Sequence, residues 1–394
     1  DSIGDIIWDR MVGTQGGQYF GSGSPTTDGG LVAIGSVCAG GGDITNFYGG
    51  YDPWIIKLDS DGETDWDFSF GTSGFEFGHP IIQTSDGGYL AGSSSHIVDG
   101  GNIDCEPYNY NAEAVLFKLD ANGNEEWYQC YGGSGHDGII HILELEDGYI
   151  FSAVGSSNDG DLESSGWHGS KDIWLVKTDF SGNIIWQKCY GGSDNEEAQN
   201  VFQTSDGGFI VFGTTNSSNG DVVGNPSNPG LSSIWVFKIS STGELIWQQC
   251  IGSHAPERVY FGVIKKSDYN YVVAGEMNFS PSGDVNCGNI CGEETNYWVF
   301  ELTDTTTAIH NIPNVAKQIK VYPNPAQSYI TFELPQLYNE CTLNIVDVYG
   351  KLQLTTKLTT TKTKVDVKTL NPGVYIYSIK AKGVNVTGRV VKVN

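Results

Sequence analysis

Carboxylate side chains recur at fixed places in the first three quarters of this 394-residue sequence. One set lies five residues after a glycine, at Glu76, Asp137, Glu196 and Glu257, with the neutral Gln18 as a fifth member. A second set directly follows a glycine in longer polar segments, at Asp43, Asn102, Asp161, Asp221 and Asp284. Side chains of this kind fix turns by accepting hydrogen bonds from backbone N–H groups, and they can also bind calcium or sugar hydroxyls.

We expect most of these side chains to fix turns. The alternative is a ligand role, with sugar hydroxyls bound by the first set and Ca²⁺ by the second, at Asp43, Asp161, Asp221 and Asp284. No other cofactor is expected, because the sequence has no zinc-spaced cysteines or histidines.

Aromatic residues are interleaved with the polar segments, at Tyr48, Tyr51, Tyr108, Tyr110, Trp167 and Tyr297. A flat ring beside carboxylates suits glycan binding, since the apolar face of a sugar stacks on the ring while its hydroxyls form hydrogen bonds. These residues are therefore the candidate ligand platform.

Catalysis by paired carboxylates is the enzymatic alternative, as in a glycosidase or lyase that acts on polysaccharide. A catalytic pair needs two inequivalent groups with different pKa values, whereas the conspicuous acids here recur in every copy. The histidines are scattered, and no nucleophile or metal motif is present. We therefore do not expect an enzyme.

The elements that position these residues belong to a module repeated five times. Its anchor is a tryptophan after a tight turn, at Trp8, Trp66, Trp127, Trp186 and Trp247, spaced by 58, 61, 59 and 61 residues. An Asp-Gly-Gly marks three copies, at Asp28, Asp86 and Asp206. Between these markers lie short runs rich in β-branched and aromatic residues and bounded by Gly, Asn or Asp, which is typical of strands joined by hairpins.

Each module is thus predicted to form four antiparallel strands, and the fold class is all-β. A period of about 60 residues indicates a solenoid or a propeller, and we expect a five-bladed β-propeller over residues 1–304. The segment around Ile6 to Met11 matches a fourth strand and would close the wheel by completing the last blade. The two carboxylate sets would then form rings on the face that carries the long loops.

Composition excludes several classes of protein. The formal net charge is −26. Residues 317–394 contain 11 Lys or Arg and 4 Asp or Glu. Residues 1–316 therefore contain 10 Lys or Arg and 43 Asp or Glu, a net charge of −33. Such an acidic region should repel nucleic acid, and no stretch of about 20 apolar residues could span a membrane. Because the numbering starts inside a repeat, we expect a signal peptide to have been removed or never included.

The eight cysteines contain no set with zinc spacing, and a local disulfide among them would require an oxidising compartment. Cys130, Cys189 and Cys250 occupy one equivalent position and are expected to be small buried side chains. A disulfide is predicted between Cys287 and Cys291, and Cys38 with Cys105 is a further possible pair.

Residues 305–316 are expected to be a linker, followed by a small Ig-like β-sandwich over residues 317–394. Three motifs mark the second region. They contain Tyr322, Pro323, Asn324 and Pro325, then Gly350 and Lys351, then Pro372, Gly373 and Tyr375, ahead of a basic final strand with Lys392.

These three motifs in order resemble the C-terminal sorting domain (type A) of cargo of the bacterial type IX secretion system. The resemblance implies Sec export, recognition of residues 317–394 by the secretion machinery, and a final place outside a Gram-negative cell or on its outer-membrane surface. It also implies that this domain is usually cleaved. The propeller modules are similar to the Trp and Asp-Gly-Gly repeats of bacterial extracellular propellers.

The predicted function is an exported cell-surface or secreted binding protein, an adhesin whose long-loop face binds a glycan or a surface protein. The alternatives are an accessory subunit of a surface complex, or the secreted polysaccharide-acting enzyme considered above.

Overall fold

The computed structural model describes residues 6–98, 100–105, 111–227, 230–277, 284, 296–303, 320–334, 341–347, 351–381 and 384–393. Tyr108, Tyr110, Cys287, Cys291, Gly350 and the predicted linker at 305–316 lie outside these ranges. The chain divides into two compact units, Asp1–Thr303 and Asp304–Asn394. Within the described ranges, no helix is of the length and hydrophobicity that a bilayer crossing requires.

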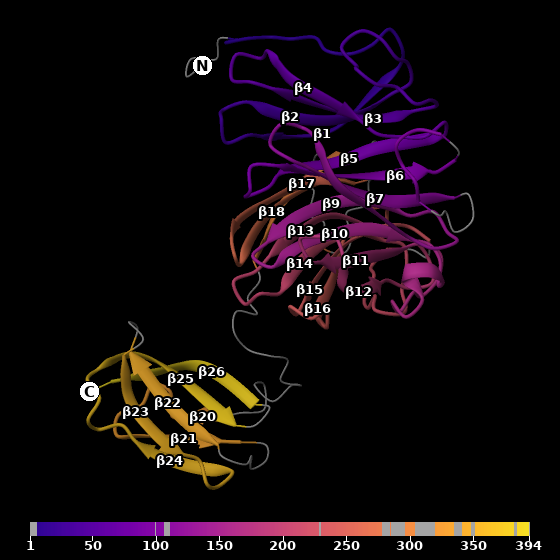
Figure 1. The fold of residues 1–394 in the computed structure, drawn as a ribbon. Coiled ribbons are helices and arrows are strands. Elements are labelled where there is room, and N and C mark those ends of the chain that lie inside the picture. Colours follow the sequence, from indigo (N-terminus) through magenta and orange to yellow (C-terminus); the bar gives the residue numbers. More distant parts are fainter. Residues whose placement is uncertain are drawn as a thin grey trace. The chain divides into compact units, whose positions relative to one another are not determined.

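The first unit, the module array, consists of antiparallel sheets in chain order (Figure 1). Sheet one contains β1 (Gln18–Pro25), β2 (Leu31–Val37), β3 (Asp52–Leu58) and β4 (Thr64–Ser69). Sheet two contains β5 (Phe75–Gln83), β6 (Tyr89–His96), β7 (Ala112–Leu119) and β8 (Glu125–Tyr131). Sheet three contains β9 (Gly138–Leu145), β10 (Gly148–Gly155), β11 (Asp172–Thr178) and β12 (Ile184–Tyr190).

Sheet four contains β13 (Glu196–Gln203), β14 (Phe209–Thr215), β15 (Ser233–Ile239) and β16 (Leu245–Ile251). Sheet five has three strands, β17 (Glu257–Ser267), β18 (Asn270–Met277) and β19 (Asn296–Thr303). A short 3-10 turn, η1 (Gly160–Leu162), lies in the long loop of sheet three. The predicted all-β module with four strands per copy is therefore found in the first four sheets.

Successive sheets pack face to face, and each junction has its own hydrophobic cluster. Between sheets one and two, Val32, Ile34 and Ile55 contact Ala91 and Phe117. Similar clusters join sheets two and three, three and four, and four and five. The central strands are buried on both faces, which explains why β3, β7 and β15 read as nearly continuous apolar runs.

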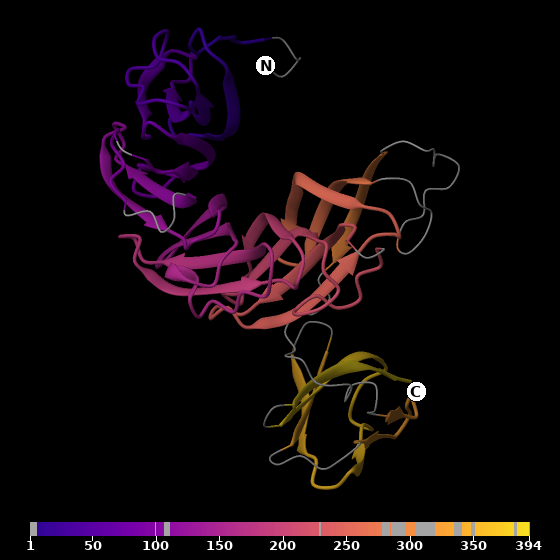
Figure 2. The ribbon, with the colours of Figure 1, turned by 90° about the vertical axis from the view of Figure 1, so that its right-hand side faces the viewer.

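The predicted closure of the wheel is not observed. The segment Ile6–Met11 forms no strand, and sheet five keeps three strands among the described residues. Figure 2 shows the first and last sheets at opposite ends of a curved row. Equivalent side chains therefore form a row along one edge of the array, and the predicted rings are replaced by this row.

The Asp-Gly-Gly marker binds a buried lysine from the third strand of its sheet. The Lys57 ammonium is 2.7 Å from the Asp28 carboxylate, Lys118 is 2.9 Å from Asp86, and Lys238 is 2.7 Å from Asp206. A Cβ at Gly30 would lie 2.8 Å from the Lys57 Nζ, so the second glycine leaves room for the ammonium. The aspartate of this tight turn is thus the counterion of a buried lysine in a mostly apolar strand.

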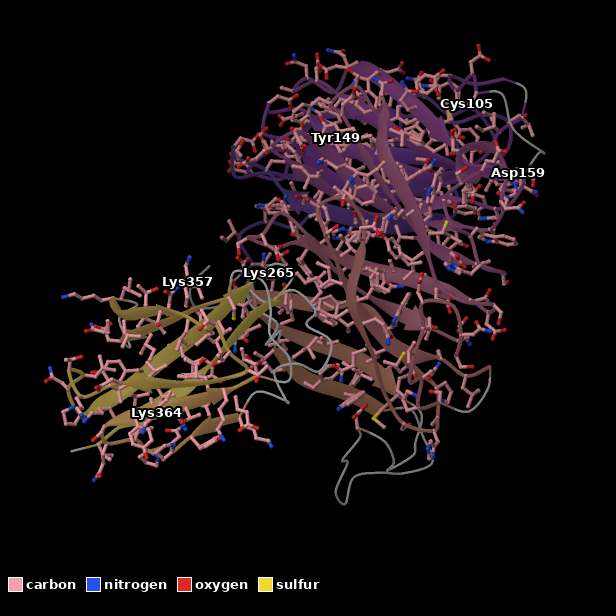
Figure 3. All side chains as sticks on the ribbon, turned by 90° about the horizontal axis from the view of Figure 1, so that it is seen from below. Cys105, Tyr149, Asp159, Lys265, Lys357 and Lys364 are labelled. Carbon is pink, nitrogen blue, oxygen red and sulfur yellow. A yellow bond between two sulfur atoms is a disulfide. The ribbon has the colours of Figure 1, made fainter. Side chains whose placement is uncertain are left out.

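The second unit has two sheets that share one core. β20 (Lys320–Tyr322), β21 (Tyr329–Glu333) and β24 (Lys362–Asp366) form one sheet. β22 (Thr342–Asp347), β23 (Leu352–Lys357), β25 (Gly373–Ala381) and β26 (Val384–Lys392) form the other. Phe332 and Val365 from the first sheet meet Leu343, Ile345 and Ile379 from the second. Lys357 and Lys364 project from this unit (Figure 3), and the Lys364 ammonium lies 3.4 Å from the centre of the Tyr329 ring.

Candidate functional site

The long loops lie on one edge of the module array, since each joins the second strand of a sheet to the third. The loops between successive sheets reach the same edge, because antiparallel strands reverse direction at every turn. Cys105 and Asp159, both in long loops, lie together on this edge (Figure 3). We call it the long-loop edge.

The long-loop acids clamp the inter-sheet loops. The Asp161 carboxylate accepts a hydrogen bond from the Gly132 N–H at 3.0 Å, and the Asp161 N–H donates to the Gly132 carbonyl at 2.9 Å. The same pair of bonds joins Asp43 to Gly13 and Asn102 to Gly71. It recurs between Asp221 and Gly191, and between Asp284 and Gly252. The turn-fixing interpretation thus accounts for the whole second set.

The first carboxylate set caps the inter-sheet loops from inside. Glu76 is fully buried and accepts hydrogen bonds from the Thr72 N–H at 3.1 Å and the Thr72 hydroxyl at 2.7 Å. Asp137, Glu196 and Glu257 are also buried, and each accepts a bond from the backbone four residues earlier. Gln18, the neutral member, is exposed and donates to the Thr14 carbonyl. Buried groups of this kind cannot touch a ligand in solution.

A second acid lies beside each of the first three capping carboxylates. A Cβ at Gly71 would lie 2.4 Å from an Asp52 oxygen and 3.0 Å from a Glu76 oxygen, so the glycine leaves this space to the pair. Equivalent glycines separate Glu113 from Asp137 and Asp172 from Glu196. In sheet four Ser233 replaces the second acid, near Glu257.

Four of these buried acids have raised pKa values. Burial raises the pKa of Glu76 to about 7, and the Asp52 charge adds to that effect. Burial also raises the pKa of Asp52, Asp137 and Asp172 to about 6 in each case. One oxygen of Asp52 and one of Asp172 accept no hydrogen bond. Glu76 therefore takes up a proton near neutral pH, and the three aspartates take one up about one pH unit lower.

The calcium prediction receives no geometric support. In the described part of the chain, no group of three or more His, Cys, Asp or Glu side chains is arranged to hold a metal ion. The oxygens of Asp43, Asp161, Asp221 and Asp284 accept bonds from backbone N–H groups instead. Calcium binding at these positions stays a prediction from the sequence.

The predicted aromatic residues do not form one platform. Trp167 is half-buried against the core between sheets two and three. Tyr48 is half-buried beside Asp52, to which its N–H donates. Tyr297 is 94% exposed at the start of β19. Of the described candidates, only Tyr51 takes part in a group of rings.

That group, the aromatic cluster, consists of Tyr19, Tyr51, Phe75 and Phe77. The Tyr51 ring centre is 5.7 Å from Tyr19, 6.1 Å from Phe75 and 5.6 Å from Phe77. Tyr19 and Phe75 are each more than half exposed. The rings come from the starts of β1 and β5 and from the residue before β3, which places the cluster at the long-loop edge between sheets one and two.

Sequence reasoning missed three of these four rings. Tyr19 starts a first strand, and Phe75 and Phe77 flank the capping Glu76. The available signal was position: aromatic residues beside an inter-sheet loop reach the long-loop edge in any antiparallel module. Their grouping depends on how sheets one and two pack.

The inner surface of the array is hollowed along the first strands of sheets one to four. A groove of about 600 Å³ is lined by Ser22, His79, Ile81, His141 and Glu197 among others, from the first strands of sheets one to four. Burial lowers the pKa of His79, and it lowers that of His141 to about 4. The groove therefore presents neutral imidazoles and aliphatic side chains beside the acidic Glu197.

The cysteine predictions need two corrections. Cys105 forms a disulfide with Cys130, with Cα atoms 6.3 Å apart, so Cys105 does not pair with Cys38. Cys38 is free and half-buried. Cys189 and Cys250 are buried as expected, but Cys130 reaches the preceding long loop of its own sheet. Three residues after the clamping residue, where module two has Cys105, the long loops of modules three and four have Ser164 and Gly224, so Cys189 and Cys250 have no equivalent partner.

The first motif of the second unit contacts the last strand, and the other two fix local turns. The Asn324 amide donates to the Arg389 carbonyl at 3.0 Å and accepts from the Val391 N–H at 2.8 Å. Tyr322 donates to Glu333, and Tyr375 donates to the Asn371 carbonyl. Lys392 is buried, and its ammonium donates to the Val393 carbonyl. Pro323, Pro325, Pro372 and Gly373 lie in or beside these turns, and the Lys351 N–H donates to Asp347.

Comparison with known proteins identifies the second unit. Residues 320–393 match the secretion system C-terminal sorting domain. This domain indicates that the protein is exported through the type IX secretion system, to the cell surface or the medium. No curated protein matches the chain.

Similarity to solved structures is distant. PorZ, a bacterial surface component of the type IX secretion system of Porphyromonas gingivalis, has 12% identity and a TM-score of 0.28 over 93% of this chain and 58% of PorZ. The extracellular domain of the one-component system BT4673 of B. thetaiotaomicron has 12% identity and a TM-score of 0.31 over 95% and 44%. Prolyl oligopeptidase B of Galerina marginata has 10% identity and a TM-score of 0.37 over 93% and 47%. The chain thus spans about half of each, and these likenesses support no inference about function.

Proposed function

We propose that the module array is the binding part of an exported protein and that its ligand is a glycan held at the aromatic cluster. The observation that carries the proposal is the grouping of four rings at the long-loop edge, two of them more than half exposed. Rings in water are costly unless they are covered, and sugar faces cover aromatic rings in binding sites.

The chemistry around the cluster suits a polyol. The first unit is strongly acidic, which disfavours anionic partners such as nucleic acid. Within the junction, Asp52 and Glu76 are buried, and the loops donate hydrogen bonds to Glu76 and to one oxygen of Asp52, so the rings would provide the affinity. Export through the type IX system places such a site where extracellular glycans are found.

The test is a glycan array with the full chain, followed by calorimetry on any sugar class that binds. Phe75→Ala and Tyr19→Ala should each weaken binding by about tenfold, since a stacked ring contributes roughly 1–2 kcal/mol. Both side chains are exposed, so the variants should fold.

Phe180→Ala is the matched control. Phe180 is also an exposed ring, but it lies in the tight turn between β11 and β12, on the opposite edge. Loss of binding in all three variants, unchanged binding in Phe75→Ala and Tyr19→Ala, or silence across the array would each contradict a glycan site at the cluster.

A further inference from the structure

The N-terminal segment 6–12 lies where the fourth strand of a preceding sheet would lie. Trp8 packs over Gly62 of the Asp-x-x-Gly turn, as Trp66 packs over Gly123 and Trp186 over Gly243 in the next modules. Arg10 pairs with Glu63, as Lys188 pairs with Glu244.

The clamp described above gives a third match. Asp43 binds Gly13 in the same way that Asn102 binds Gly71. Gly71 lies two residues after the end of the fourth strand β4. The segment therefore keeps the contacts of a fourth strand, although it pairs with no third strand among the described residues.

Sheet five lacks a fourth strand among the described residues. Its last strand, β19, has no partner on its outer side among the described residues, whereas β3, β7, β11 and β15 each pair with a fourth strand. In sheet four, Trp235 pairs with Cys250, three residues after Trp247. The equivalent residues are Trp298 in β19 and Met11, three residues after Trp8.

The outer faces of the two terminal sheets are both apolar. On sheet one, Leu31, Ala33, Trp54, Ile56 and Leu58 line a groove of about 390 Å³ together with Phe20, which is 78% exposed. Trp54, Ile56 and Leu58 are already buried, and Val12 of the N-terminal segment packs against their cluster. Their counterparts in sheet two, which include Tyr89, Ala91 and Phe117, are buried against sheet one. We call this surface the leading face.

The trailing face lies on sheet five and contains Ile264, Val272, Ala274 and Val299. Ile264 is 66% exposed and Val299 is 64% exposed. Val272, Ala274 and Val299 occupy the places of Ile210, Phe212 and Val236, which are fully buried in the junction of sheets four and five. The trailing face of one array thus has the same kind of surface that packs on a leading face at every internal junction.

We propose that two copies of this chain associate head to tail, with the trailing face of one copy on the leading face of the next. The N-terminal segment of the second copy then adds to β19 of the first as its fourth strand. A second copy is favoured over closure within one chain because the first and last sheets lie at opposite ends of the curved row (Figure 2). A contact between two different faces propagates or closes into a ring of copies.

Burial of the exposed apolar residues supports this partner. Ile6, Ile7 and Met11 are 81%, 77% and 97% exposed, whereas Cys189 and Cys250, which are equivalent to Met11, are buried. Pairing with β19 would bury Met11 in the same way. It would also cover a strand edge that is otherwise open to pairing with other chains.

The experiment measures the mass of the full chain by light scattering and sedimentation over a wide concentration range. The mass of the wild-type particle should be a multiple of 42.6 kDa, and this mass should rise with protein concentration. Phe20→Asp changes only the leading face and Val299→Asp only the trailing face, and each variant alone should have the mass of one chain. Ile185→Asp, an exposed residue of β12 away from both faces, should associate like the wild type.

Mixing the two variants gives the decisive result. Phe20→Asp retains a trailing face and Val299→Asp retains a leading face. An equal mixture should therefore form pairs that contain one chain of each variant, and nothing larger. A wild-type mass of one chain at every concentration would overturn the proposal, as would a mixture that stays monomeric while circular dichroism shows both variants folded. Glycan binding by a monomer would leave the proposed function intact, so the two proposals fail separately.

Discussion

At the scale of single residues, the carboxylates of the long-loop edge bind backbone groups. Asp161 and its four equivalents each bind both the N–H and the carbonyl of an inter-sheet glycine. The chain offers its own control, since Asn102 does the same work without a charge. The geometry of the clamp therefore requires a planar acceptor and not a negative charge.

We expect Asp161→Asn to unfold in urea close to the wild type and Asp161→Ala to lose about 1–3 kcal/mol. The alanine variant leaves the Gly132 N–H without its acceptor, and an unsatisfied buried group costs this amount. Equal losses for both variants would show that charge matters, and no loss for either would show that the clamp is dispensable.

At the scale of elements, the strands and turns could be predicted from the sequence because local residues determine them. In module four, the runs Phe209–Gly213 and Leu245–Cys250 are rich in β-branched and aromatic residues, and β14 and β16 cover them. The packing angle between sheets could not be predicted, because it depends on side chains from two modules at once. This is why closure by Ile6–Met11 was wrong.

The candidate site also combines features that local sequence determines with features that depend on the packing of two sheets. The turn role of Asp161 follows from a glycine and an acid in sequence, whereas the ring cluster of Tyr19, Tyr51 and Phe75 requires the approach of two sheets. The Cys105–Cys130 disulfide joins a long loop to the fourth strand of the same sheet. A repeat pattern that grouped Cys130 with Cys189 and Cys250 concealed it.

The Asp-Gly-Gly turn gives a prediction at the scale of elements. Burial raises the pKa of Asp86, but hydrogen bonds from Thr84 and Lys118 outweigh it and lower that pKa to about 2. Asp86→Ala leaves the buried Lys118 with only the partly exposed Glu126 as counterion, and we expect a loss of about 2–4 kcal/mol in chemical unfolding.

Lys118→Met is the companion variant. It replaces the charge by an apolar side chain of similar length, so it should cost less than Asp86→Ala. A larger loss for Lys118→Met would mean that the ion pair, and not the avoidance of an unpaired charge, stabilises the turn.

At the scale of the whole molecule, buried acids along the row link stability to pH. Glu76 binds a proton in the folded state up to about pH 7, whereas its unfolded pKa is near 4.5. Between these values the folded state holds more protons, so the contribution of Glu76 to stability is lost as pH rises. Neutral buried histidines such as His141 act in the opposite direction below about pH 6.5.

The comparison of Glu76→Gln with the wild type isolates the carboxylate from the histidines. At pH 5 both proteins carry an uncharged group and should melt at similar temperatures. At pH 8 the variant should be more stable by roughly 2–3 kcal/mol, because the wild type then buries a charge. Exposed Glu163→Gln is the control, and a difference for Glu76→Gln that does not change with pH would contradict the assignment.

The clamp between each glycine and the following long loop has an evolutionary consequence. Every such contact is completed within one repeat and its immediate neighbour, and none spans the array. Unequal recombination that added or removed a whole repeat would therefore leave all remaining contacts satisfied. The clamps would therefore not oppose a change in the number of repeats, and the hydrophobic cluster of each new junction would decide whether that change is tolerated.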